Sequence, residues 1–591
     1  MSIQNTKGIL RLLTVFAATA VMLTLAQQPI GWWPLAWVAY VPFILACLPK
    51  TFTAENAESA EKKNEIKKKV PDTFFYLIAY IAGFIYWLGN IYWMSFVTVV
   101  GWIAFCLYTA LLWPVLALSL RWCRTKRIPL FIAVPVLIVG IEQMQGLFLG
   151  GFYWNYLAHS QFTNTTLIQI ADIFGAAGVS FVVAMVNGLV AEMLLVRRPW
   201  LVVRNLIIAT IILVGTLGYG QWRISQSDKF VTPGPMIAAV QTNIPIAVKK
   251  SFAAEEQIFD ELLEQSNQCI SAGAKLVVWP ETMVQAILNQ QVLRLLIDDH
   301  SYKLFDATIS EHAKKGAYVL VGAYDGTPRY DANDIRLAQK FNSAFLYKSD
   351  GSQAPQKYSK IYLVPFGEML PFSNIPLIHK LFLTMSPYDF DYTIDPGTEY
   401  TVFEMQPQDA NRTYTFSVMI CYEDAVPFMA RKFALDEKGN KRINWLVNIS
   451  NDGWFVRFEN GKVLPATELS QHAVICAFRA VENRLAVMRS VNTGISCMVD
   501  TLGRIKDGYA AGNLPQKAFD RQGVTGWFAD TVPIDARTTF FSKHGQWLDF
   551  ACQLSVVVII IAQIAERFFL KRRTKGEKGS KINGNETHGK K

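Results

Sequence analysis

The sequence lacks the short motifs that mark most nucleotide-binding sites and serine-hydrolase sites. It contains no GxxxxGK[ST] or GxGxxG stretch to bind phosphates and no GxSxG stretch to carry a serine nucleophile. The eight cysteines form no CxxC pair and no zinc-ligand spacing, and four of them lie in or beside apolar runs. We therefore expect no metal ion, no cofactor and no disulfide framework.

Histidine is scarce as well, with seven in 591 residues. None of them follows a predicted strand end, where a catalytic base would be expected, and His472 falls within a predicted helix. A Cys–His or Ser–His–Asp arrangement is therefore not indicated.

Apolar residues are abundant instead. They make up 51% of the chain, which is too much for an ordinary soluble enzyme and indicates a polytopic membrane protein. Eight runs are long enough to span a bilayer, seven before a long polar region and one after it. They lie at about Gly8–Ala26, Gly31–Leu48, Phe74–Trp93, Phe96–Leu120, Ile128–Leu149, Leu167–Val196, Leu201–Gly220 and Leu548–Ala565.

The net charge of +10 follows the membrane topology and does not form a nucleic-acid-binding face. Lysines and arginines cluster at the N-terminus, after the second and fourth runs, between the sixth and seventh, and after the eighth. The short loops on the other side carry none. By the positive-inside rule both termini are cytoplasmic and the polar region is periplasmic.

Strand and helix patterns alternate through the polar region, which favours an α/β domain. Expected strands include Met236–Gln241, Lys275–Trp279, Tyr318–Ala323 and Tyr414–Ile420, and Ala466–Asn483 is an expected helix. The run Ser359–Thr393 has several prolines and many aromatics but little periodicity. It predicts a long functional loop.

Three groups in this region fit one chemistry. Glu281 follows a strand that ends in Trp-Pro, Lys360 lies in the long loop with Glu368, and Cys421 follows the strand Tyr414–Ile420. Alone, each has an ordinary explanation, because most free cysteines are inert and most charges lie on the surface. Together they fit a base that takes the thiol proton, a cation that stabilises an oxyanion, and a thiolate that attacks an acyl carbon.

The motifs that carry these groups resemble those of a known superfamily. WPE, KxxLVPFGExxP and CYE, in this order and at comparable intervals, are similar to the Glu–Lys–Cys motifs of the nitrilase superfamily. Such a domain before a last membrane helix looks like the apolipoprotein N-acyltransferase family. Further stretches that resemble this family are Gly151–Trp154, Asn448–Phe455 and Arg489–Ile495.

The resemblance implies a fold and a domain order. The fold is a nitrilase-like αββα sandwich, inserted between the seventh and eighth helices of an eight-helix transmembrane bundle. The implied domains are the helices at 1–221, the catalytic domain at 222–547, a last helix at 548–570 and a basic tail at 571–591.

The resemblance also implies residue roles. Glu281 would be the general base, Lys360 the oxyanion cation and Cys421 the nucleophile. The backbone N–H of Tyr422 would be a second oxyanion donor. Glu368 would orient the lysine or assist proton transfer. Further supporting positions are Tyr422, Glu423 and the pocket aromatic Trp454.

The implied reaction is acyl transfer in the bacterial inner membrane. A phospholipid would be the acyl donor, a diacylated apolipoprotein the acceptor, and the acyl chain would pass through a Cys421 thioester. Three alternatives are weighed: a membrane-tethered hydrolase, a lipid-binding receptor or transporter that has lost catalysis, and a polyisoprenyl-dependent glycosyltransferase. A tethered hydrolase would need only one helix, and a receptor or transporter would not need all three catalytic residue types. A glycosyltransferase would need a metal or sugar-nucleotide motif, which the sequence lacks.

The membrane part has ionisable, aromatic and lysine-rich features that the proposed chemistry does not explain. Glu142 and Asp172 lie near outer helix ends, where an ionisable group is costly unless it is paired or hydrated. The stretch Gly150–Tyr156 is either an aromatic belt or a lipid entry surface. The lysine-rich loop at residues 50–70 predicts a solvated linker.

Overall fold

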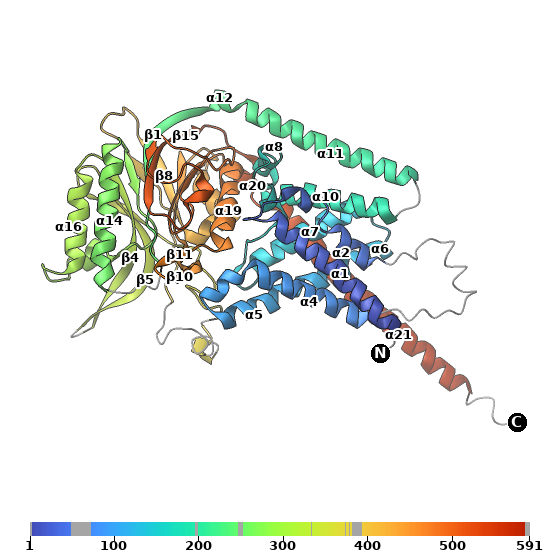
Figure 1. The fold of residues 1–591 in the computed structure, drawn as a ribbon. Helices are drawn as coiled ribbons and strands as arrows, with labels where there is room; N and C mark the ends of the chain where they lie inside the picture. Colours follow the sequence, from blue (N-terminus) through green and yellow to red (C-terminus); the bar gives the residue numbers. More distant parts are fainter. Residues whose placement is uncertain are drawn as a thin grey trace.

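The computed structural model describes residues 3–48, 72–195, 199–245, 252–331, 334–372, 374–377, 379–380 and 393–585. The lysine-rich loop and part of the Ser359–Thr393 loop lie outside these residues. Figure 1 shows a helical part next to a part built of sheets and helices, with both chain ends at the far side of the helical part.

Seven helices in the described ranges are long and apolar enough to cross a membrane. Most match the expected runs, and α5 and α6 together form one apolar segment, Val99–Thr125. The helices are α1 (Ile3–Ala26), α4 (Asp72–Asn90), α5 (Val99–Ala110), α6 (Leu112–Thr125), α7 (Leu130–Leu147), α10 (Ala176–Leu195), α11 (Pro199–Ser225) and α21 (Trp547–Asn585).

The expected count of eight long helices is not confirmed, because the second apolar run is interrupted. It forms a 3-10 helix, η1 (Trp33–Trp37), and a short helix, α2 (Val41–Cys47). A proline stands at the start of each. Proline has no backbone N–H, so it begins a helix readily but does not continue one.

The sixth run is divided too. Two single-turn helices, α8 (Thr165–Ile168) and α9 (Ala171–Phe174), precede α10. The break falls at Gly175, whose φ is +67° and where an added Cβ would lie 2.6 Å from the ring of Phe541. Only glycine combines this backbone conformation with so close a neighbour.

The other part holds two large sheets and a two-stranded one, formed by β10 (Arg457–Glu459) and β11 (Lys462–Leu464). In the largest one the strand order is β14-β15-β1-β2-β4-β5-β6, with β3 also paired to β4. Its strands are β1 (Val231–Gln241), β2 (Leu276–Val278), β3 (Val284–Ile287), β4 (Tyr318–Asp331), β5 (Asp334–Tyr347), β6 (Gln353–Ser359), β14 (Ala511–Gly512) and β15 (Gly526–Asp535).

The five-stranded sheet has the order β13-β12-β9-β8-β7, and its central strands β8, β9 and β12 run parallel. The strands are β7 (Phe403–Met405), β8 (Tyr414–Ile420), β9 (Trp445–Asn451), β12 (Ala486–Asn492) and β13 (Cys497–Val499). Strand β8 matches the expected strand residue for residue. Parallel strands direct their carboxyl ends to one edge, where α/β folds place ligands.

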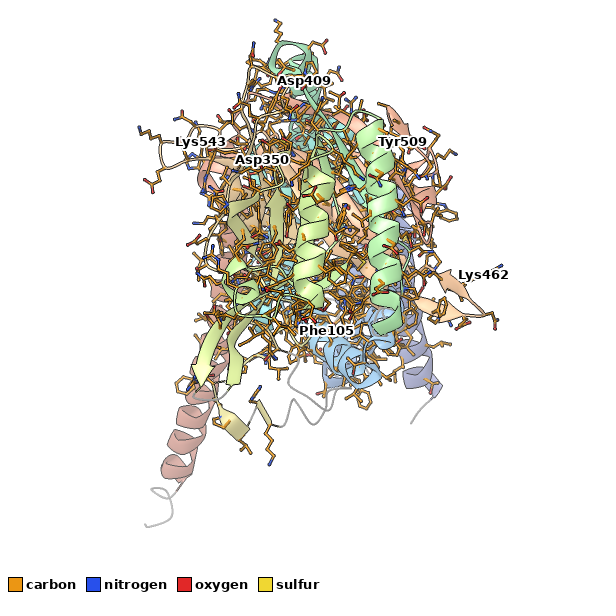
Figure 2. The ribbon with its side chains drawn as sticks, turned by 90° about the vertical axis from the view of Figure 1, so that its left-hand side faces the viewer. Phe105, Asp350, Asp409, Lys462, Tyr509 and Lys543 are labelled. Atoms are coloured by element: carbon orange, nitrogen blue, oxygen red, sulfur yellow. The ribbon has the colours of Figure 1, made fainter. Side chains whose placement is uncertain are left out.

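The two large sheets face each other and helices cover their outer sides. Ser490 of β12 donates a hydrogen bond to the carbonyls of Val240 and Val278 in the other sheet, at 2.8 and 3.0 Å. Helices α14 (Phe252–Ser271) and α16 (Ser301–Ala313) cover the larger sheet and face the viewer in Figure 2. Helix α19 (Thr467–Asn483) lies between the smaller sheet and the membrane helices in Figure 1. The layers are therefore α-β-β-α, as expected.

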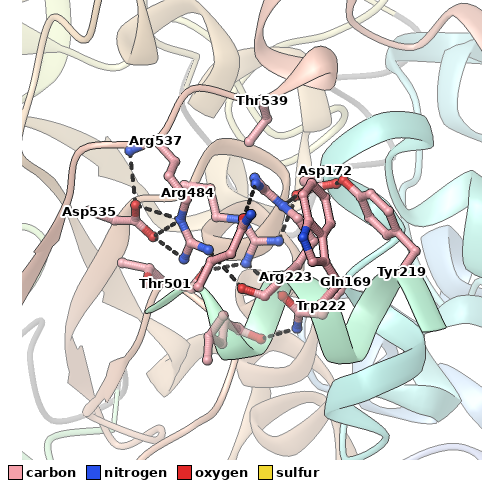
Figure 3. A network of polar contacts seen from close by, with 12 residues as sticks. Gln169, Asp172, Tyr219, Trp222, Arg223, Arg484, Thr501, Asp535, Arg537 and Thr539 are labelled. Atoms are coloured by element: carbon pink, nitrogen blue, oxygen red, sulfur yellow. Dashed lines mark hydrogen bonds and ion pairs between the residues drawn. The ribbon is translucent and has the colours of Figure 1, made fainter. Parts of the chain in front are cut away.

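Asp172 joins the two parts through buried ion pairs (Figure 3). Its Oδ2 accepts from Arg484, which ends α19, at 2.6 Å and from Arg223 of α11 at 2.7 Å. Tyr219 donates to Oδ1 at 2.6 Å. The charge expected to be costly near the membrane is therefore paired.

Only one carboxylate oxygen of Glu142 is hydrogen-bonded. Its Oε1 accepts the backbone N–H of Leu157 at 2.6 Å, whereas Oε2 is buried without a hydrogen-bond partner.

Candidate active site

Cys421 occupies a strained turn directly after β8. It begins a 3-10 helix, η5 (Cys421–Ala425), and has a φ of +52°. A non-glycine residue in this region costs about 1–3 kcal/mol and persists where the surroundings enforce it. The residue is 9% exposed, and the other seven cysteines are less exposed, at 3% or below.

Glu281 emerges after β2, where Trp279 and Pro280 turn the chain. Its side chain is 7% exposed. Oε1 accepts from the Asn342 amide at 2.6 Å, and Oε2 accepts the backbone N–H of Asn451 at 2.8 Å. These two bonds fix the carboxylate from both sheets, because Asn342 lies in β5 and Asn451 ends β9.

Lys360 follows β6 and lies between two carboxylates. Its Nζ is 2.8 Å from Glu368 and 3.6 Å from Oε1 of Glu281, and the side chain is 1% exposed. Burial acts to lower the pKa of Lys360, but Glu368 and Glu281 outweigh it and hold the pKa well above its usual value. The lysine is therefore a permanent cation.

The charges around Cys421 oppose one another. Burial, and after it the negative charge of Glu281, raise the pKa of the thiol, and Lys360 acts in the opposite direction. The resting group is thus a neutral thiol. A thiolate forms when its proton is removed close to the lysine.

Glu423 ties the Cys421 turn to the Lys360 loop. Its fully buried carboxylate accepts backbone N–H groups from Ile420 at 2.8 Å, Ile361 at 2.8 Å and Tyr362 at 2.9 Å. The Tyr358 hydroxyl donates to it at 2.8 Å. Burial raises the pKa of Glu423 to about 7, against these donors. The Glu423 side chain therefore holds the Cys421 turn and the Lys360 loop together.

Tyr422 connects the site to the membrane-side aromatic stretch. Its hydroxyl donates to the carbonyl of Gly151 at 3.2 Å and accepts the backbone N–H of Tyr153 at 3.0 Å. Its ring stacks on Trp154, with centroids 6.3 Å apart and planes at 19°. The aromatic stretch therefore packs against the residue that follows Cys421. An aromatic belt at the membrane interface would not need such contacts with the site.

Trp454 lies half-buried in a second turn, η6 (Asp452–Phe455), directly after β9. This turn also follows Asn451, the donor to Glu281, so it borders the same site.

The structure brings together Glu281, Lys360 and Glu368, with the charges of the first two acting on Cys421. Asn342 could not be predicted from the sequence, because no motif marks it within its strand. His472 lies in the expected helix, and its ring hydrogen-bonds to Asp424 at 2.7 Å behind the Cys421 turn. The distance of 48 residues between the two explains why no local pattern signals this contact.

Two family models match the chain. Residues 19–189 match the apolipoprotein N-acyltransferase N-terminal domain, and residues 236–518 match the carbon-nitrogen hydrolase family. The matches follow the helical part and the sheet part and together cover most of the chain.

Curated relatives match over nearly the full length. The apolipoprotein N-acyltransferase of Geobacter metallireducens is 27% identical, over 92% of this chain and 93% of the relative. That of Rhodopseudomonas palustris is 23% identical, over 91% and 92%.

Among solved structures, an amidase from Nesterenkonia sp. is similar at a TM-score of 0.33 and 16% identity, and the match covers 51% of this chain and 92% of the amidase. The apolar helices and the bacterial relatives make this a multi-pass bacterial membrane protein. The chain belongs to the apolipoprotein N-acyltransferase family of the nitrilase superfamily.

Proposed function

We propose that this protein transfers an acyl chain from a membrane phospholipid to the N-terminal amine of a diacylglyceryl-cysteine lipoprotein, with Cys421 as the nucleophile. The observation that carries the chemistry is the row of charges Glu281–Lys360–Glu368, with distances of 3.6 and 2.8 Å, beside a thiol at positive φ. This row contains a base and a cation but no histidine.

In the first step Glu281 takes the thiol proton, and the Cys421 sulfur forms a bond to the ester carbonyl carbon. Lys360 and the backbone N–H of Tyr422 stabilise the oxyanion. The ester C–O bond then breaks, and the leaving oxygen takes the proton from Glu281. A lysophospholipid leaves and an acyl-thioester remains.

In the second step the neutral acceptor amine attacks the thioester carbon. A C–N bond forms, Glu281 takes a proton from the nitrogen, and the C–S bond breaks. The proton returns to the Cys421 sulfur. Overall an ester and an amine become an amide and an alcohol, with no net change of charge.

We assign supporting roles to Glu368 and Glu423. Glu368 adds a second negative charge that keeps Lys360 protonated through the cycle. Glu423 keeps the lysine loop and the Cys421 turn in one arrangement through its four donors. We assign Trp454 to the acyl pocket, beside Asn451 and Glu281.

From the loop charges and the positive-inside rule we infer that the sheet part is periplasmic and that both chain ends are cytoplasmic. Six of the long helices precede the sheet part in the described residues, so one further crossing is needed. The apolar segment Trp33–Cys47 is available for it. At the start of α2, within this segment, side chains of α10 and α1 accept backbone N–H groups: Asn187 accepts from Tyr40 at 2.8 Å and Thr19 from Phe43 at 3.1 Å.

With that crossing the domains are helices at 1–221, a catalytic domain at 222–547, a last helix at 548–570 and a basic tail at 571–591.

The test is an acyl adduct on Cys421. We expect purified protein incubated with a phospholipid of one defined acyl composition to gain that acyl mass on the Cys421 peptide. A diacylated lipopeptide should then remove the adduct and become N-acylated. Cys421→Ser should form no thioester adduct and should not N-acylate the lipopeptide, yet remain membrane-inserted.

Two results would contradict the proposal. Release of free fatty acid at the full rate without acceptor would favour the hydrolase alternative. N-acylation by Cys421→Ala would rule out this nucleophile. Cys269→Ala is the matched control, because Cys269 is a fully buried thiol on α14 with no place in the site.

A further inference from the structure

Helix α19 supports both turns of the site from behind. Turn η5 carries Cys421, and η6 carries Trp454 and follows Asn451, which donates to Glu281. Two adjacent residues of α19, Gln471 and His472, each contact both turns or the residues packed on them. Neither has a role in the acyl-transfer steps above.

His472 contacts the two turns through their acids. Its Nε2 hydrogen-bonds Asp424 of η5 at 2.7 Å, and its Nδ1 lies 3.4 Å from Asp452 of η6. Nδ1 is also 3.2 Å from Glu468, one helical turn earlier. The imidazole thus lies between acids of both turns, with 2% of its side chain exposed.

Arg489 of β12 joins the same acids from the other side. Its guanidinium donates to Asp424 at 2.5 Å, to Asn448 at 2.9 Å and to Asp452 at 3.3 Å. Asp452, Glu468 and His472 each have one possible metal-ligand atom, and these three atoms lie within 4.8 Å of one another. Here, however, the arginine already supplies the positive charge that a metal ion would bring.

Gln471 contacts the two turns through tryptophans. Its Oε1 accepts the indole N–H of Trp154 at 2.8 Å and that of Trp93 at 3.3 Å. Trp154 stacks on Tyr422 of η5, and Trp93 packs on Phe455 of η6 with centroids 4.9 Å apart. One amide oxygen therefore holds two indoles from separate membrane-side loops, one against each turn.

We propose that Gln471 and His472 are positioning residues for acyl transfer: His472, with Arg489, fixes the acids of both turns, and Gln471 fixes the tryptophans packed on them. This inference rests on the proposed function, since it assigns the two residues to the same reaction. They set where the Cys421 sulfur lies relative to Glu281, and they tie that position to loops at the membrane surface.

Burial and Arg489 act to lower the pKa of His472, but Asp424 and Asp452 outweigh them and hold the pKa well above its usual value. The imidazole is therefore a cation, and its charge acts on Cys421 through Asp452. Facing the imidazole are Asp424, Asp452, Arg489 and, on its own helix, Glu468. Asp452 is among the charges that raise the pKa of Cys421. Removing the cation beside Asp452 should raise the pKa of the thiol further.

The first experiment uses His472→Gln in the full-length protein. Glutamine keeps an N–H donor for Asp424 but carries no charge. We expect acyl-enzyme formation from phospholipid to slow about tenfold, and the pH inflection of iodoacetamide alkylation at the Cys421 peptide to rise by about 0.5 unit. Loss of structure alone would expose the thiol and move the inflection the other way, down toward that of a free cysteine.

The second experiment is a double-mutant cycle. Gln471→Leu removes the acceptor, and Trp154→Phe removes the indole donor but keeps a ring. Because both remove the same hydrogen bond, the double variant should form acyl-enzyme no more slowly than the slower single variant. If the rate reductions of the two single variants multiply in the double variant, the assignment of Gln471 is wrong. This cycle tests the proposal even if His472→Gln does not fold.

Matched controls are His312→Gln and Gln265→Leu, a buried histidine and a buried glutamine elsewhere in the sheet part. Both should acylate at the wild-type rate. The inference is overturned if His472→Gln and Gln471→Leu do so too, or if the inflection of the folded His472→Gln protein does not move. Absence of any adduct in the wild-type protein would instead refute the proposed function, and the alkylation inflection would still report on His472.

Discussion

At the scale of single residues, opposed charges decide when Cys421 is nucleophilic. Burial and Glu281 keep the sulfur protonated, and Lys360 favours the thiolate. The base is therefore also a group that holds the thiol neutral. Once Glu281 accepts the proton its charge is neutralised, and the thiolate keeps the stabilising charge of Lys360 without the repulsion of Glu281. Proton transfer thus removes the repulsion that opposed it.

This arrangement predicts opposite effects on thiol chemistry and on acyl transfer. Glu281→Gln removes a negative charge, so the pKa of Cys421 should fall and alkylation at a fixed pH near 8 should become faster. Acyl-enzyme formation should nevertheless fall about 100-fold or more, because the base is lost. The pH profile of iodoacetamide alkylation and the acyl-adduct mass measure the two effects.

Lys360→Met is the matched comparison. It should move the alkylation inflection to higher pH and also abolish adduct formation. An inflection that moves the same way in both variants would contradict the assigned charges.

At the scale of elements, strands and their ends could be predicted from the sequence, and long-range contacts could not. Strand β8 is an apolar run that ends at Cys421, so its pattern is local. The Asn342 donor to Glu281 lies 61 residues away in the chain, and nothing in its strand distinguishes it. The prediction of one long helix over Gly31–Leu48 is wrong for a different reason. Hydropathy alone does not register the prolines that begin two short helices within Trp33–Cys47.

Gly322 of β4 sets the position of the Glu281 turn. An added Cβ would lie 2.5 Å from the carbonyl oxygen of Pro280 and 2.8 Å from the Cα of Glu281, both backbone atoms. We expect Gly322→Ala to displace the turn, destabilise the protein by about 1–3 kcal/mol and slow acyl-enzyme formation. Thermal unfolding and the adduct rate test this. Gly218→Ala is the control, since nothing lies within 4 Å of its added Cβ, and equal rates in both variants would contradict the packing argument.

At the scale of the whole molecule, hydrogen bonds and ion pairs hold the sheet part on the helices, as the proposed transfer between two membrane lipids requires. Near the site, the Tyr422 hydroxyl does this by donating to the Gly151 carbonyl and accepting the Tyr153 backbone N–H. Further away, Arg484 and Asp172 make a pair with side chains 0% and 1% exposed. Arg484 has a φ of +50° at the end of α19, so the backbone there is also held in an uncommon conformation.

The Arg484–Asp172 pair yields a prediction with a specific sign. Asp172→Leu leaves the Arg484 guanidinium buried without its counter-ion and should cost about 3–5 kcal/mol, seen as a lower Tm in detergent. The double variant Asp172→Leu/Arg484→Leu removes both charges and should be more stable than Asp172→Leu alone. Asp298→Asn, at an exposed ion pair with Lys303, should leave the Tm unchanged. A double variant less stable than Asp172→Leu would mean that Arg484 stabilises the junction through its bonds to Gln169 and the Thr501 carbonyl, independently of Asp172.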